Sequence, residues 1–214
     1  MTATLGEFTR WLEELIPPAF QEHYDNSGLQ VGDPDASVSS VLLTVDVTSE
    51  VIAEAREHDC NLIISHHPLI FTPLNRITNG SETERCVASA VRAGIAIYSA
   101  HTSFDNVAWG VSHILAEKIG LTKIKALAPL KGKLLKLITF VPVSHAGRVR
   151  EALFAAGAGH IGNYDRCSFS VAGDGTYRAG EGADPFAGQV GEDHSEPEIR
   201  IEAVMPAYLS SACI

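Results

Sequence analysis

The chain has 214 residues, a length that suits one large domain or two small ones. Hydrophobic residues make up 45% and charged residues 20%, which is the composition of a globular protein rather than of a disordered one. The formal net charge of −10 argues against direct binding to nucleic acid or to an anionic membrane, because both need a positive surface. No apolar run approaches the roughly 20 residues that a membrane-spanning helix needs.

The predicted elements begin with a helix over residues 5–16, where Phe8, Leu12 and Leu15 share one face before Pro17 and Pro18 end it. A loop rich in turn-forming residues is expected over 24–32. Short apolar runs then alternate with helical patterns: strands over 41–45, 61–65 and 95–99, and helices over 48–58, 81–93 and 108–119. This alternation predicts an α/β fold with a mixed sheet that helices cover on both faces.

Capping residues support the starts of two of these helices. Thr48 or Ser49 is the candidate N-cap of the second helix, and Ser81 is that of the third. Glu84 follows Ser81 at the spacing of a capping box, and Gly94 is placed to close that helix.

A second, smaller unit is expected after a connector over 122–133. Its pattern predicts strands over 134–141, 166–172 and 198–204, a helix over 145–156, a loop with room for a hairpin over 173–197, and the beginning of a helix over 206–213. We therefore divide the chain into residues 1–129 and 130–214. Nothing at Ile214 resembles the end of a helix, so the natural chain is expected to be longer.

The four cysteines do not indicate a metal site. None forms a C-x-x-C pair, and no histidine or basic residue is placed to activate a thiol. The N-terminal residues lack the layout of a signal peptide, so reduced thiols in a cytoplasmic protein are expected. The cysteines are Cys60, Cys86, Cys167 and Cys213.

Two histidines, His66 and His67, directly follow the predicted strand over 61–65. Ligands of open α/β sheets bind beyond the carboxyl ends of the strands, and neutral imidazole is a common ligand of zinc and iron. Adjacent histidines cannot point the same way, but each can serve a different metal of a close pair. Two loop histidines that bind no metal and only form hydrogen bonds would give the same sequence pattern.

A second polar loop follows the predicted strand over 95–99 and is expected to emerge at the same edge of the sheet. It contains His101 and Asp105. A carboxylate with two imidazoles is a sound start for a metal site, and His101 could be a ligand or could orient one. Asp105 could instead cap the next helix or close a turn.

Two metals need more ligands than these. Glu22, His23 and Asp25 are candidates by residue type only, and a role in its own turn is the better prediction for Asp25. Asp46 follows the first apolar strand, where it could reach the site or cap the next helix.

A glycine cluster over 157–165 has no dinucleotide-binding pattern and is predicted to be a structural turn. Within it, His160 is expected to be an ordinary loop histidine. His145 and His194 have no partners nearby in the sequence and receive no role.

Three stretches together resemble the GTP cyclohydrolase I type 2 homologues, also called NIF-three-like dinuclear-metal-centre proteins. They run from Asp25 to Gly32 (DNSGLQVG), from Ile64 to Phe71 (ISHHPLIF) and from His101 to Asp105 (HTSFD). The glycine cluster running on to Phe169 is similar to the small domain that longer members carry as an insert. The resemblance covers nearly the whole chain.

The resemblance implies that His66, His67 and Asp105 bind two divalent metal ions, which could be zinc, iron or manganese, with His101 near them. As the candidate catalytic residue, His101 would orient a ligand or shuttle a proton. It also implies an α+β insert that is ferredoxin-like, similar to PII and CutA-type proteins, and a cytoplasmic homo-oligomer, a hexamer. Members return a further His and Glu from a second α/β half. Nothing in this chain matches that motif.

Two functions follow as hypotheses. One is metal-assisted hydrolysis of a small nucleotide-like substrate such as GTP, in which two metals share an activated water. The other is a non-catalytic metal-binding or protein-interaction module. A scaffold without metal is disfavoured because both polar loops are expected at one edge of the sheet.

Overall fold

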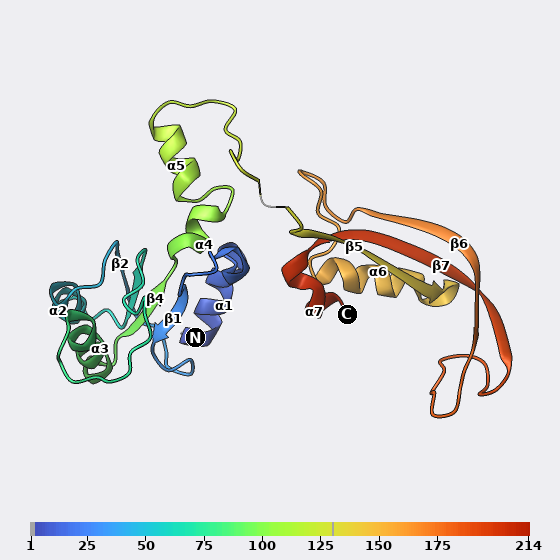
Figure 1. The fold of residues 1–214 in the computed structure, drawn as a ribbon, viewed down its shortest axis with the longest axis horizontal. Helices are drawn as coiled ribbons and strands as arrows, with labels where there is room; N and C mark the ends of the chain where they lie inside the picture. Colours follow the sequence, from blue (N-terminus) through green and yellow to red (C-terminus); the bar gives the residue numbers. More distant parts are fainter. Residues whose placement is uncertain (1–2, 130) are drawn as a thin grey trace. The chain divides into compact units, whose positions relative to one another are not determined.

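A computed structural model describes residues 3–129 and 131–214. The chain forms two compact units that divide between Ala126 and Leu127, close to the boundary placed at residue 129 from the sequence (Figure 1). No helix among the described residues is both long and apolar enough to cross a membrane.

The first unit is built on a four-stranded mixed sheet with the strand order β1-β4-β3-β2. The strands β2, β3 and β4 run parallel, whereas β1 pairs antiparallel with β4 at one edge. The strands are β1 (Gly28–Val31), β2 (Val41–Thr44), β3 (Leu62–Ser65) and β4 (Ala96–Ser99). The helices are α1 (Leu5–Leu15), η1 (Pro18–Phe20), α2 (Ser49–Glu57), α3 (Glu82–Ala93), α4 (His101–Asn106) and α5 (Val111–Lys118).

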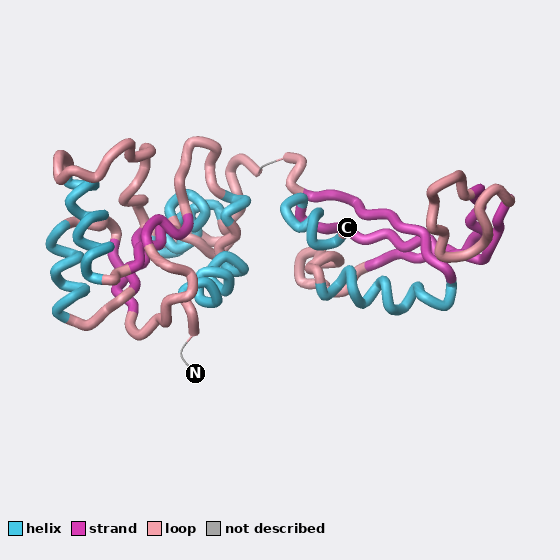
Figure 2. Tube along the Cα trace, turned by 90° about the horizontal axis from the view of Figure 1, so that it is seen from below, coloured by secondary structure: helices cyan, strands magenta, loops and turns pink. Residues whose placement is uncertain are grey.

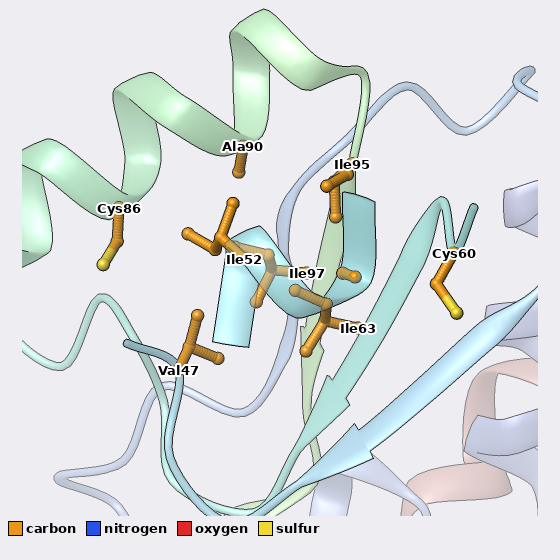
Figure 3. Packing of buried hydrophobic residues seen from close by; sticks show 9 residues of the cluster. Val47, Ile52, Cys60, Ile63, Cys86, Ala90, Ile95 and Ile97 are labelled. Atoms are coloured by element: carbon orange, nitrogen blue, oxygen red, sulfur yellow. The ribbon is translucent and has the colours of Figure 1, made fainter. Parts of the chain in front are cut away.

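Alternate side chains of the central strands supply two cores, one on each face of this sheet. Ile63 and Ile97 pack with residues of α2 and α3 on one face, as Figure 3 shows. Their neighbours Leu62 and Tyr98 pack against α1 on the other face. Side chains that follow one another along a strand point to opposite faces, so strands apolar throughout are buried on both sides. The predicted fold class, a mixed sheet covered on both faces, is confirmed.

Local capping chemistry sets where the helices begin. Thr4 and Glu7 form a complete capping box at α1, which the sequence had not suggested. Thr48 caps α2, and Ser81 caps α3 by accepting a hydrogen bond from the backbone N–H of Glu84, as predicted. The Glu84 carboxylate accepts the Ser81 hydroxyl and the N–H groups of Thr78 and Gly80, rather than the N–H of Ser81 that a capping box requires.

Two expectations for the first unit were wrong. The predicted loop over 24–32 contains β1, which forms because β4 offers it an antiparallel partner. The polar loop predicted to contain His101 and Asp105 is also wrong, because these residues form the short helix α4, which is separate from α5, the predicted helix over 108–119. Gly110 lies at the break, where an added Cβ would stand only 1.8 Å from the carbonyl oxygen of Phe104.

The second unit has a three-stranded antiparallel sheet with the order β5-β7-β6 (Figure 2). The helix α6 (Ala146–Ala155) packs on one face, where Leu153 meets Ile201 and Met205. The strands are β5 (Leu134–Pro142), β6 (Ser168–Arg178) and β7 (Asp193–Pro206), and the short helices are η2 (Val143–His145), η3 (Ala207–Leu209) and α7 (Ser210–Cys213). The ferredoxin-like identity of this unit stays a prediction.

The stretch 173–197, predicted as a loop with room for a hairpin, contains the end of a hairpin. The strand β6 continues to Arg178 and β7 starts at Asp193, so the two ends of the stretch are paired and a loop over 179–192 joins them. Gly173 and Gly175, which favoured a loop, lie inside β6. An added Cβ at Gly175 would meet the side chain of Glu198 on β7, so the glycine leaves room for that side chain in its present position.

Candidate metal centre

The two histidine-containing loops leave neighbouring strands at the same edge of the sheet. Ser65 at the end of β3 is in register with Ser99 at the end of β4. Beyond the strands, the backbone N–H of His101 donates to the carbonyl of His66 at 2.9 Å. The Ser99 hydroxyl donates to that same carbonyl at 2.8 Å. The loops are therefore held together by their own main chain.

Three imidazole rings gather at this edge. The ring centroids of His66 and His67 are 4.9 Å apart, and the ring of His101 lies 5.6 Å and 5.7 Å from them. Asp105 lies one helical turn after His101 on α4, with its Oδ1 3.9 Å from Nε2 of His66. The structure thus brings together the four residues singled out from the sequence.

His66 is suited to remain neutral. Burial lowers the pKa of its ring most, the nearby Asp105 carboxylate opposes that effect, and the rings of His67 and His101 lower the pKa further. The pKa of His66 lies below its usual value as a result. A neutral imidazole is the form that binds a metal.

His67 has a carboxylate partner from the end of β2. Its Nδ1 lies 2.7 Å from Oδ1 of Asp46, with both side chains largely exposed. Of the two roles left open for Asp46, the structure therefore supports contact with the site, while Thr48 caps α2. A carboxylate on one ring nitrogen is the arrangement that orients metal-binding histidines, because it leaves Nε2 for the metal.

Asp25 does more than close its own turn. Its carboxylate accepts the N–H of Asn26 at 2.6 Å and the hydroxyl of Ser27 at 2.7 Å, as a turn residue would. It also accepts from Nδ1 of His101 at 2.7 Å and from the N–H and hydroxyl of Thr102. The sequence carried no local signal for this contact, because Asp25 and His101 are 76 residues apart.

These hydrogen bonds favour the ionised form of Asp25 although its side chain is buried. Burial alone would raise the pKa of its carboxyl, but the bonds from His101, Thr102, Ser27 and the Asn26 backbone together lower that pKa to about 2. Asp25 is therefore a carboxylate at neutral pH.

Other candidates lie outside the histidine cluster. Glu22 contacts α4 through Thr102 and Asn106, and His23 packs edge-on against Tyr24. In the second unit, the glycine cluster forms the turn after α6, with Gly159 donating to the carbonyl of Val204.

The donor atoms are of the types that bind metal ions. Imidazole nitrogens with a carboxylate suit zinc, iron or manganese. Ligands about 2.1 Å from one ion stand roughly 3–3.5 Å apart, slightly closer than the 3.9 Å between His66 and Asp105. Within residues 3–129 and 131–214, no three His, Cys, Asp or Glu side chains have the spacing of one metal's ligands.

One side of the cluster is apolar. A cavity of about 380 Å³ borders His66, over the carboxyl ends of β2 and β3 and against α1 and α4. Its lining includes Leu12, Ile16, Leu43, Val45, Ile64, Ala100 and Phe104. A low-dielectric wall of this kind strengthens electrostatic interactions at the histidines.

Comparisons with known proteins agree with the resemblance seen in the sequence. The sequence profile of the Duf34/NIF3 (NGG1p interacting factor 3) family matches residues 3–187. A Bacillus subtilis protein named GTP cyclohydrolase 1 type 2 homolog is 40% identical over 203 residues, 94% of this chain and 54% of that protein. A Mycobacterium tuberculosis protein of the same name is 37% identical over 209 residues, covering 97% and 55%. The chain thus spans about half the length of these relatives.

Solved structures extend the likeness to the fold. A Bacillus cereus protein related to NIF3 superposes with a TM-score of 0.83 at 39% identity, over 100% of this chain and 57% of that one. A Staphylococcus aureus protein gives a TM-score of 0.69 at 27% identity, over 98% and 54%. On these matches, the chain belongs to the Duf34/NIF3 family.

Proposed function

We propose that this chain supplies part of a dinuclear metal centre, with His66, His67 and Asp105 as ligands, and that the centre serves metal-dependent hydrolysis of a nucleotide-like substrate. The observation that carries the proposal is the convergence of these residues with His101 where β3 and β4 end. Four such side chains at one sheet edge, beside an apolar wall, are a characteristic setting for catalysis.

The roles of the side chains follow from their surroundings. The low pKa of His66 keeps its ring neutral for ligation, and Asp46 orients the ring of His67. Two divalent ions, when bound, supply Lewis acidity and lower the pKa of a water molecule. His101, next to both histidines, is placed to hold or transfer a proton at its Nε2 atom.

The names of the relatives support GTP as the first substrate to test. The relatives are roughly twice as long as this chain, so the activity of a whole protein is part of the proposal. A cytoplasmic location and assembly of identical subunits into a hexamer remain predictions from the resemblance.

Metal content tests the ligands directly. The 214-residue chain, purified without an affinity tag and then incubated with zinc or manganese and desalted, should retain metal by elemental analysis. His67→Ala and Asp105→Ala should each lower the retained metal about 10-fold or more, because each removes a direct ligand. The matched control is His113→Ala on α5, which removes a histidine that pairs with Glu117. Equal metal in all four proteins would contradict the ligand assignment.

Activity tests the reaction separately. GTP is incubated with the metal-loaded chain and with the metal-loaded Bacillus subtilis relative, and formate and ring-opened products are measured. Product from the relative that disappears on metal removal would support hydrolysis by this type of centre. Bound metal with no product from GTP or from a panel of phosphoesters would favour the non-catalytic metal-binding alternative.

A further inference from the structure

The carboxylate of Asp25 is buried next to His101, one of the three clustered histidines. The side chain of Asp25 has none of its surface exposed, and that of its partner His101 has only 18%. Burying an ionised carboxylate is costly unless hydrogen bonds compensate it. Here donors from two separate segments, residues 26–27 and 101–102, supply that compensation. The arrangement joins the loop after η1 to the first turn of α4.

The carboxylate dictates which nitrogen of His101 carries the proton. An ionised carboxyl only accepts hydrogen bonds, so Nδ1 of His101, 2.7 Å away, must be the donor. In a neutral ring the proton is then absent from Nε2, which keeps a lone pair. That ring lies beside both His66 and His67. The nitrogen without a proton is the one that can accept a proton or bind an ion.

We infer that Asp25 is a positioning residue that locks His101 in its Nδ1–H tautomer and holds its ring against the His66–His67 pair. The inference deepens the proposed function, on which its catalytic meaning rests. The tautomer itself is a property of this chain and can be measured whether or not hydrolysis occurs.

The same carboxylate anchors the backbone that carries His101. His101 has a φ of +20°, an unusual value for a residue other than glycine. Ala100, the residue before α4, offers no side chain to cap the helix. Asp25 takes over this task by accepting the N–H of Thr102 at 3.2 Å and the Thr102 hydroxyl. One side chain thus fixes the turn, the helix start and the ring together.

The second carboxylate–histidine pair provides an internal comparison. The side chains of His67 and Asp46 are 49% and 64% exposed, so water competes for their hydrogen bond. Removing Asp46 should alter His67 without altering His101. Thr102→Val is a further control, because it removes a hydroxyl from Asp25 but leaves the bond to His101.

The test is nitrogen NMR of the histidine rings in the metal-free 214-residue chain at neutral pH. Long-range proton–nitrogen spectra distinguish the two tautomers, and His101→Gln identifies the signals of His101. We expect wild-type His101 to be essentially all Nδ1–H. Asp25→Ala should move it toward the Nε2–H form, and Asp25→Asn, which keeps the size of the side chain, should give a mixture. Asp46→Ala and Thr102→Val should leave it unchanged.

Two results would overturn the inference. One is an Nε2–H tautomer of His101 in the wild-type chain, a result that needs no variant to fold. The other is an unchanged tautomer in folded Asp25→Ala or Asp25→Asn. If a preparation hydrolyses GTP, Asp25→Asn should lower kcat by roughly 10- to 100-fold with a smaller change in KM. An Nδ1–H ring in a protein without hydrolysis would reject the proposed reaction and leave the positioning intact.

Discussion

The two carboxylate–histidine pairs of the site differ in how far water reaches them. Asp25 and His101 are shielded, whereas Asp46 and His67 lie at the surface. Neighbouring charges therefore act on the buried pair with little screening, while salt weakens the exposed one. We expect the buried pair to contribute to stability as well as to position.

The contribution of the Asp25 carboxylate to stability should depend on pH. The pKa of Asp25 is lowered to about 2 from 3.8, so its ionised form stabilises the folded chain at neutral pH. A lowered pKa means that this stabilisation is complete above about pH 4 and disappears as the pH falls toward 2. In urea unfolding, the stability difference between wild type and Asp25→Asn should be largest near pH 6 and should shrink below pH 4. A difference that grows on acidification would contradict the low pKa.

A second prediction concerns the N-cap of α3. Ser81 accepts the backbone N–H of Glu84 at 3.2 Å, so Ser81→Ala should lower the free energy of unfolding by about 1 kcal/mol. Ser81→Gly should cost only a few tenths of a kcal/mol, because glycine is tolerated at this position. Trp11 and Trp109 are the two tryptophans of the chain and lie in the first unit, so their fluorescence in urea reports on its unfolding. Equal losses for both variants would contradict the capping role.

At the scale of elements, the connection between α4 and α5 depends on a missing side chain. A Cβ on Gly110 would meet the carbonyl oxygen of Phe104 at 1.8 Å, a contact that backbone movement alone could relieve. Gly110→Ala should therefore lower the stability of the first unit by about 1–3 kcal/mol and should disturb Asp105 on α4. The control is Gly80→Ala, whose Cβ would make only ordinary contacts from 3.5 Å, and it should change stability by less than about 0.5 kcal/mol. Similar stabilities for the two variants would contradict the close approach of Gly110 to the carbonyl oxygen of Phe104.

Elements of the first unit could be predicted wherever local pattern and burial agree. Strands such as β3 and β4 are apolar throughout because both faces are covered, and their parallel direction brings His66 and His101 to one edge. The strand β1 could not be predicted, because its turn-forming residues become extended only by pairing with β4. The contact of Asp25 with His101 could not be predicted for the same reason, because it forms only when two segments far apart in the sequence fold together.

At the scale of the whole molecule, the two units each have a core of their own. The segment between α5 and β5 has no regular structure in its described residues, and Lys123 and Lys125 are exposed there. Lys131 and Lys133 are exposed in the same segment, so trypsin should cut first at these four lysines and release two fragments that resist further digestion. Replacing all four lysines with glutamine should slow that cut several-fold, as gel analysis over time would show. First cleavage inside either unit would argue against this division.

The long pairing of β5 with β7 has a consequence for protein synthesis. Leu134 lies opposite Pro206, so β5 leaves the ribosome well before the residues that it pairs with have been made. The sheet of the first unit, in contrast, is complete once β4 has emerged, and it can fold while translation continues. Until β7 follows, β5 has no strand beside it, and its core side chains Leu137 and Val141 lack their packing partners on β7. The nascent chain is therefore most exposed to chaperones, and to mispairing with other chains, while residues 143–206 are being translated.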